Sequence, residues 1–174
     1  LDVASCLPID YLRQLRAFTD TLKPVFVLLG EAVGGDYNQW MGTVWCHSVT
    51  NYGCFKGLWS SFNDRNLFEI GHSLARQYGP EPWTLYKRAH LLSFADNHDV
   101  TRLASKLTEP RHIPLAYAIL MGMPGTPALY YGSEWGIKGE KGACSDDELR
   151  PALEQPEWND LTDWIAKLAA ARRN

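Results

Sequence analysis

The sequence predicts an α/β fold in which parallel strands alternate with helices. Five short apolar stretches read as strands, and segments of helical periodicity separate them. The stretch "PVFVLLGEA" (24–32) is an unbroken apolar run, which is typical of a strand buried on both faces of a parallel sheet. Polar residues stand at several of the expected strand ends, where parallel α/β folds gather functional groups. These observations fit a closed barrel and an open doubly wound sheet equally well.

The expected elements follow one another along the whole chain. Strands are predicted at 1–4, 24–32, 43–49, 90–96 and 126–134, and helices at 8–23, 52–78, 100–107, 112–123 and 158–173. Pro8 suits a helix start, and Gly79 with two nearby prolines suits a helix end. No repeat, low-complexity segment or linker interrupts the pattern, so we expect one domain over residues 1–174.

Composition excludes several classes of protein. The net charge is −3, with acids and bases mixed along the chain, which argues against nucleic-acid and membrane-surface partners. The longest apolar stretches are too short to cross a membrane. The four cysteines form no CxxC pair and read as buried thiols, which favours a reducing compartment such as the cytoplasm.

Three carboxylates are the candidate catalytic groups. Asp2, Glu31 and Asp99 each lie at or just past an expected strand, and in a parallel sheet such positions converge on one face. Two close carboxylates suit retaining glycoside cleavage, in which one attacks and the other donates a proton. Each residue also has a simpler interpretation, as a helix cap, a turn residue or an ion-pair partner. A metal site is weaker, because His98 and Asp99 lack a metal-ligand spacing.

Four segments resemble the α-amylase superfamily of glycoside hydrolases (family 13). "FADNHDVTR" resembles its Asn-His-Asp segment, and "VFVLLGEA" resembles the segment that carries its catalytic Glu. "LDVA" is similar to the end of the segment with the nucleophilic Asp, and "GMPGTPALYYGSEWGIKG" to its eighth strand and following loop. The segments occur in the family's order. The resemblance therefore implies the C-terminal half of a (β/α)8 TIM barrel, about strands 4 to 8 with their helices.

The resemblance also implies a role for each site residue. Asp2 would be the nucleophile, Glu31 the general acid and then base, and Asp99 the group that holds the sugar's 2- and 3-hydroxyls. His98 would hydrogen-bond the same sugar. Asn97 and Arg102 are further substrate-side candidates, Arg102 as a support of its segment.

Aromatic residues are numerous, with seven Trp, eight Tyr and six Phe. They either fill the core or line a groove that stacks on sugar rings. Trp40 and Trp135 are the preferred stacking candidates, because both follow expected strand ends.

We expect the chain to be a catalytic-domain fragment truncated at its N-terminus, because it begins without Met and inside an apparent strand. The resemblance implies no cofactor or metal in this segment, and calcium only in the complete protein. A half-barrel exposes strand edges, so we expect little activity from the segment alone and association through those edges.

Three functions remain open from the sequence. The first is a retaining hydrolase of α-glucosidic bonds in starch-like or maltooligosaccharide substrates. The second is a transglycosylase or a sucrose- or trehalose-type isomerase of the same fold. The third is a non-catalytic relative that serves as a binding subunit, which the presence of all three carboxylates disfavours.

Overall fold

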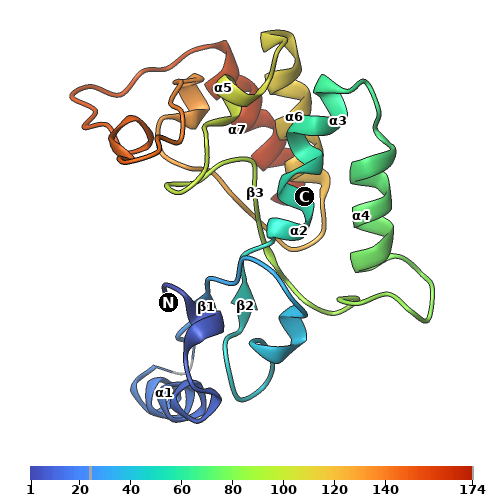
Figure 1. The fold of residues 1–174 in the computed structure, drawn as a ribbon, viewed down its shortest axis with the longest axis vertical. Coiled ribbons are helices and arrows are strands. Elements are labelled where there is room, and N and C mark those ends of the chain that lie inside the picture. The colour runs from blue at the N-terminus through green and yellow to red at the C-terminus, as the bar shows by residue number, and fades with distance from the viewer. Residues whose placement is uncertain (24, 174) are drawn as a thin grey trace.

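Four short parallel strands and seven helices build the fold (Figure 1) in this computed structural model, which describes residues 1–23 and 25–173. The strands are β1 (Leu29–Gly30), β2 (Ser48–Val49), β3 (Leu92–Phe94) and β4 (Thr126–Ala128). The helices are α1 (Ile9–Leu22), α2 (Tyr52–Phe55), α3 (Gly57–Asn63), α4 (Phe68–Tyr78), α5 (Leu103–Lys106), α6 (Ile113–Gly122) and α7 (Asp160–Arg173). Strands thus alternate with helical segments, as the sequence predicts.

The strands run side by side in chain order. β1 pairs with β2, with Leu29 opposite Ser48, and β3 pairs with β4, with Leu92 opposite Thr126. A parallel bridge between Thr50 and Leu92 joins the two pairs. All these pairings are parallel, so the carboxyl ends of the four strands lie along the same edge.

The first residue extends this sheet beyond β1. The amino group of Leu1 donates to Leu29 O at 2.7 Å, and Glu31 N donates to Leu1 O at 2.9 Å. The predicted strand at 1–4 is nevertheless wrong beyond Leu1. Val3 has a left-handed backbone (φ 42°), and Ala4–Cys6 forms a 3-10 helix.

The predicted strands are longer than those observed. In the run 24–32, residue 24 lies outside the described residues, and only Leu29–Gly30 forms a strand. The exposed fractions of Val25 and Val27 are 76% and 66%, so the prediction of burial on both faces is wrong. The 43–49 strand shrinks to Ser48–Val49.

The strand predicted at 126–134 ends at Ala128. Gly132 adopts a left-handed backbone (φ 80°), and Ser133–Trp135 forms a 3-10 helix, which turns the chain out of the sheet. The helix predicted at 52–78 is divided into α2, α3 and α4. Its main break includes Arg65, which has a positive φ of 52°.

Two apolar clusters hold the elements together. One contains Leu12 of α1, Tyr37, Val49 and Leu91, and lies under the N-terminal strands. The other contains residues of the helices α2 to α7, with Leu58, Tyr117, Leu120 and Ile165 fully or almost fully buried. Burial of each such side chain contributes about 1.5–3 kcal/mol.

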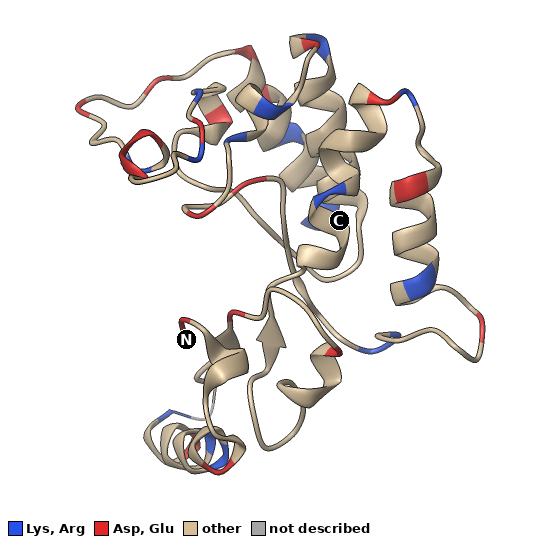
Figure 2. Ribbon diagram, viewed as in Figure 1, with Lys and Arg blue, Asp and Glu red and all other residues tan. Residues whose placement is uncertain are grey.

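Charged residues of both signs are distributed over the molecule (Figure 2). The segment before α7, for example, contains the ion pair of Lys141 with Asp146 at 2.9 Å. Within the part of the chain that the structure describes, no helix has the length and apolar character to cross a membrane.

Candidate active site

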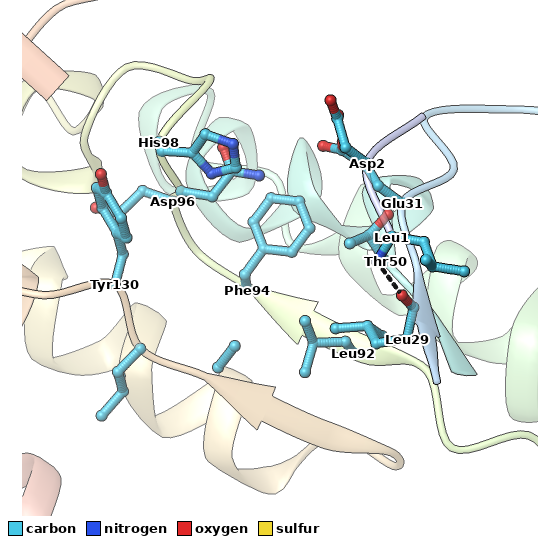
Figure 3. A pocket seen from close by; sticks show the side chains of 13 residues that line it. Leu1, Asp2, Leu29, Glu31, Thr50, Leu92, Phe94, Asp96, His98 and Tyr130 are labelled. Atoms are coloured by element: carbon cyan, nitrogen blue, oxygen red, sulfur yellow. Dashed lines mark hydrogen bonds between the residues drawn. The ribbon is translucent and has the colours of Figure 1, made fainter. Parts of the chain in front are cut away.

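A pocket of about 330 Å³ lies at the carboxyl ends of the strands. Its wall is built from Leu1 and Asp2, from the ends of β1 and β2, from β3 with its following loop, and from the residues after β4. Figure 3 shows Asp2 and Glu31 on one side of Phe94, and Asp96, His98 and Tyr130 on the other. An apolar floor with polar groups on both sides is the usual construction of a small-molecule site.

Asp2 reaches the pocket because its neighbour is fixed to the sheet. The two hydrogen bonds between Leu1 and the β1 backbone set the start of the chain beside Leu29 and Glu31. The turn at Asp2 and Val3 then leaves the sheet, and the Asp2 side chain stays exposed at the pocket. In this exposed position the Asp2 carboxyl group is accessible to a ligand.

Glu31 follows β1 directly and is half-buried in the same pocket. Its backbone donates to Leu1 O, and the next residue, Ala32, exchanges two hydrogen bonds with the Thr50 side chain at 3.0 and 3.2 Å. The Tyr52 hydroxyl donates to Glu31 Oε1 at 3.3 Å. Backbone and side chain of Glu31 are therefore both held from neighbouring segments.

The loop after β3 brings Asn97 and His98 to the opposite wall. Asn97 has protein partners for both ends of its amide: its Nδ2 donates to Tyr52 Oη at 3.0 Å, and its Oδ1 accepts from Asp99 N at 2.9 Å. The His98 side chain is 49% exposed, so its imidazole is accessible from the pocket.

Asp96, at the start of this loop, is buried. Its Oδ2 accepts hydrogen bonds from Leu103 N and from Ser133 Oγ, both at 2.8 Å. Burial raises the pKa of Asp96, and these two hydrogen bonds act in the opposite direction. Asp96 thereby joins the end of β3 to the start of α5 and to the segment after β4.

Asp99 lies next to the pocket lining, and the side chains of Arg150 and His98 contact its carboxylate. Arg150 Nη2 donates to Asp99 Oδ1 at 2.8 Å, and His98 Nε2 lies 3.4 Å from Asp99 Oδ2. The structure thus brings Asp2 and Glu31 into one pocket and places Asp99 one residue beyond its wall, in an ion pair with Arg150.

Arg102, named on the substrate side as a support of its segment, lies outside the pocket lining. Its side chain is fully buried and donates to Tyr131 O, Ser133 Oγ and Leu149 O at 2.6, 2.9 and 2.8 Å. The guanidinium also lies over the Tyr130 ring, 4.3 Å from its centroid. Arg102 therefore supports the walls of the site from behind.

The two tryptophans chosen for sugar stacking are also absent from the described pocket lining. Trp40 packs against the cluster that contains Leu12 and Tyr37. Trp135 is half-buried in the 3-10 helix after β4, where its carbonyl accepts from Asn159 Nδ2 at 3.0 Å. Both rings follow strand ends, but the chain turns away from the pocket before it reaches them.

The sequence analysis did not predict Phe94 in the pocket or the hydrogen bonds of Tyr52, and it did not prefer Tyr130 among the aromatic residues. Phe94 forms part of the pocket wall, and Tyr130 follows β4 into it. Tyr52 lies just past the end of β2, so the rule that singled out Glu31 and Asp99 also applies to it. Among the described residues, no cluster of three or more His, Cys, Asp or Glu is arranged to hold a metal ion.

Comparison with curated proteins gives amylases and glucanotransferases. The intracellular maltogenic amylase of Bacillus subtilis (strain 168) is 24% identical over 179 residues, which cover 99% of this chain and 29% of the relative. The α-amylase of Saccharomycopsis fibuligera is 38% identical over 85 residues, 47% of this chain and 16% of the relative. The chain thus spans less than a third of the length of these relatives.

Solved structures share the fold. The crystal structure of an Anoxybacillus α-amylase matches with a TM-score of 0.83 at 23% identity, covering 99% of this chain and 38% of that one. A cyclic α-maltosyl-(1→6)-maltose hydrolase from Arthrobacter globiformis matches with a TM-score of 0.78 at 20% identity, covering 97% and 38%. The chain accordingly has the fold of part of an α-amylase TIM barrel.

A family model described as the catalytic domain of alpha amylase matches residues 7–167. This range takes in all four strands, the loop with Asn97 and His98, and the helices that cover them. The pocket lies at the carboxyl ends of parallel strands, where barrel enzymes place their active sites, so its position agrees with the family match. The chain belongs to the α-amylase catalytic-domain family.

Proposed function

We propose that this chain is part of a retaining glycoside hydrolase that cleaves α-glucosidic bonds in starch-like or maltooligosaccharide substrates. The supporting observation is that Asp2 and Glu31, from separate segments, line one pocket beside His98. Retaining cleavage requires two carboxyl groups, one as the nucleophile and one as the acid and base. The relatives named as amylases favour α-glucans as the substrate class.

In this proposal Asp2 attacks the anomeric carbon and forms a glycosyl-enzyme. Glu31 gives a proton to the departing glycosidic oxygen and then takes one from the water that releases the sugar. Asp99 and His98 hold hydroxyls of the same glucosyl ring. Contacts of this kind raise the rate when they tighten as the ring flattens toward the transition state.

Asp99 would have to exchange a partner in this mechanism. In the structure its Oδ1 accepts from Arg150, and a sugar hydroxyl would need to take that position or use the other oxygen. The side chains of Asp99 and Arg150 are 35% and 49% exposed, so their ion pair is weak enough to open for a ligand.

The proposal extends to the whole barrel. We propose that the described strands correspond to about strands 5 to 8 of a (β/α)8 barrel, with Leu1 at the end of strand 4. The backbone hydrogen bonds of Leu1 to Leu29 and Glu31 support this correspondence. Because half of the pocket wall would then come from the other strands, the isolated chain should be almost inactive.

The test is the Glu31→Gln variant in the full-length protein that contains this chain. Glutamine keeps the shape but cannot donate an acidic proton, so kcat on maltooligosaccharides should fall by a factor of about 100 to 10,000. Glu81→Gln, at an exposed loop position, is the matched control and should keep wild-type turnover. Unchanged turnover in Glu31→Gln would remove the catalytic assignment.

Transfer to a second sugar is the alternative that an observation supports. The 4-α-glucanotransferase of Thermotoga neapolitana is 43% identical over 51 residues, 28% of this chain and 11% of the relative. Chromatography of the products from maltotriose separates the two reactions. A hydrolase releases glucose and maltose, whereas a transferase makes chains longer than the substrate.

A further inference from the structure

The Tyr52 hydroxyl connects the two sides of the pocket. Tyr52 is the first residue of α2, and two residues separate it from the end of β2. Its oxygen accepts from Asn97 Nδ2 at 3.0 Å, and it donates to Glu31 Oε1 at 3.3 Å. The loops after β1 and β3 are therefore joined through a side chain that comes from the end of the strand between them.

The direction of these hydrogen bonds is fixed by the backbone. The amide hydrogen of Asp99 needs an acceptor, which is Asn97 Oδ1 at 2.9 Å. The amide of Asn97 must then present its Nδ2 to Tyr52 as a donor. Since the hydroxyl oxygen already accepts there, its single hydrogen is available for Glu31.

The Tyr52 ring has little freedom to leave this position. It meets Phe94 edge-on, with centroids 4.9 Å apart and an interplanar angle of 79°, and it meets Phe55 at 6.2 Å and 72°. Burial and the nearby Glu31 and Asp99 carboxylates raise the pKa of Tyr52. The hydroxyl therefore keeps its hydrogen throughout the neutral range and remains a donor.

Only one oxygen of Glu31 is engaged in this way. Among the described residues, no hydrogen bond reaches Glu31 Oε2, whereas Oε1 accepts from Tyr52. An oxygen that accepts a hydrogen bond is the poorer place for the acidic proton, because the two hydrogens would compete for the same region. The proton is thus directed to Oε2.

We propose that Tyr52 is a positioning residue that holds Oε1 of Glu31 and leaves Oε2 as the atom that transfers the proton. The inference rests on the proposed function. In the first step the Oε2 proton moves to the glycosidic oxygen, which receives the electron pair of the breaking C–O bond while Asp2 bonds to the anomeric carbon. Tyr52 keeps its own proton, and Asn97 fixes the direction in which it points.

The test uses Tyr52→Phe in the full-length protein, with two substrates that differ in their need for an acid. Phenylalanine keeps the ring packing and removes only the hydroxyl. Formation of the glycosyl-enzyme from maltooligosaccharides needs the proton of Glu31, so kcat/KM, which reports this first step, should fall about 10- to 100-fold when the acid is misplaced. Maltosyl fluoride releases a fluoride ion that needs no proton, so its kcat/KM should change by less than about 3-fold.

Tyr78→Phe is the matched control. The Tyr78 hydroxyl is buried at the end of α4, and within the described residues it has no hydrogen-bond partner. Its removal should leave both rates at wild-type values, and thermal unfolding of all three proteins shows whether the fold is intact.

The outcomes separate this inference from the proposed function. A loss confined to maltooligosaccharides supports the positioning role. An equal loss on both substrates, or no loss on either, overturns it while wild-type cleavage still upholds the hydrolase. If wild-type protein cleaves neither substrate, the proposed function itself fails.

Discussion

Arg102 is the buried residue behind the segment that contains Asn97 and His98. It stands three residues after Asp99 in the sequence, where it was expected to support that segment. In the structure its guanidinium is fully buried and satisfies two carbonyls and one hydroxyl from the segments after β4. The planar guanidinium group presents several N–H donors in a fixed geometry, which suits three separate acceptors better than the flexible ammonium group of a lysine would.

Replacement of Arg102 should therefore affect stability first. Arg102→Ala leaves the Leu149 carbonyl buried without its donor and removes the donor to Ser133 Oγ, and should lower the free energy of unfolding by about 3 kcal/mol. Arg111→Ala, whose side chain is 86% exposed, should change it by less than about 1 kcal/mol. Urea denaturation of both variants measures the difference. Equal values would show that the buried contacts of Arg102 contribute little.

The polar site residues were easier to predict than the aromatic ones. Asp2 and Glu31 follow from their place at or just past expected strands, because parallel strands bring such positions to one edge. His98 follows from its place in the Asn-His-Asp segment. Trp40 and Trp135 lie further past their strand ends, and a ring at that distance can pack against other elements instead, as Trp40 does against the cluster of Leu12 and Tyr37. Sequence spacing does not determine which way such a loop turns.

At the scale of elements, the order was predictable and the lengths were not. The alternation of strands and helices follows from periodicity, and α1 and α7 begin and end within a few residues of the expected positions. Strand length depends on hydrogen-bond partners in other parts of the chain. The apolar run before Leu29 has few such partners here, so it stays outside the sheet despite its composition.

The turn into β4 gives an element-scale prediction. Gly125 has a φ of 90°, and a Cβ atom there would collide with the backbone oxygen of Leu91, next to β3. Gly125→Ala should therefore destabilise the protein by at least about 2 kcal/mol and weaken the β3–β4 pairing.

Gly71→Ala is the opposite case and serves as the control. Gly71 lies inside α4 with open space around its Cα, so alanine should raise the free energy of unfolding by up to about 1 kcal/mol. Thermal or urea unfolding of both variants measures whether each is less or more stable than the wild type. A Gly125→Ala variant as stable as wild type would contradict the close approach of the two strands.

At the scale of the whole molecule, the wall of the pocket continues into an uncovered apolar surface. Leu29, Leu92 and Phe94 line the pocket. Val27 precedes Leu29 by two residues along the extended chain, which places it on the same face, and it is 66% exposed. Leu129, which follows β4 and also lines the pocket, is 41% exposed. This face corresponds to the interior of the proposed barrel.

We expect the isolated chain to cover this face by self-association, with two copies completing one barrel-like assembly. Burial of each valine or leucine on the face would contribute about 1.5–3 kcal/mol, whereas exposure to water forfeits that gain. Light scattering over a micromolar concentration series should give a mass close to twice that of the monomer.

Val27→Lys should shift the mass to the monomer value, because an ammonium group cannot be buried there without a partner. Val44→Lys, at a 46% exposed position before β2, should associate like wild type. A monomeric mass for the wild-type chain at every concentration would contradict the prediction, because this face would then remain exposed to water without causing association.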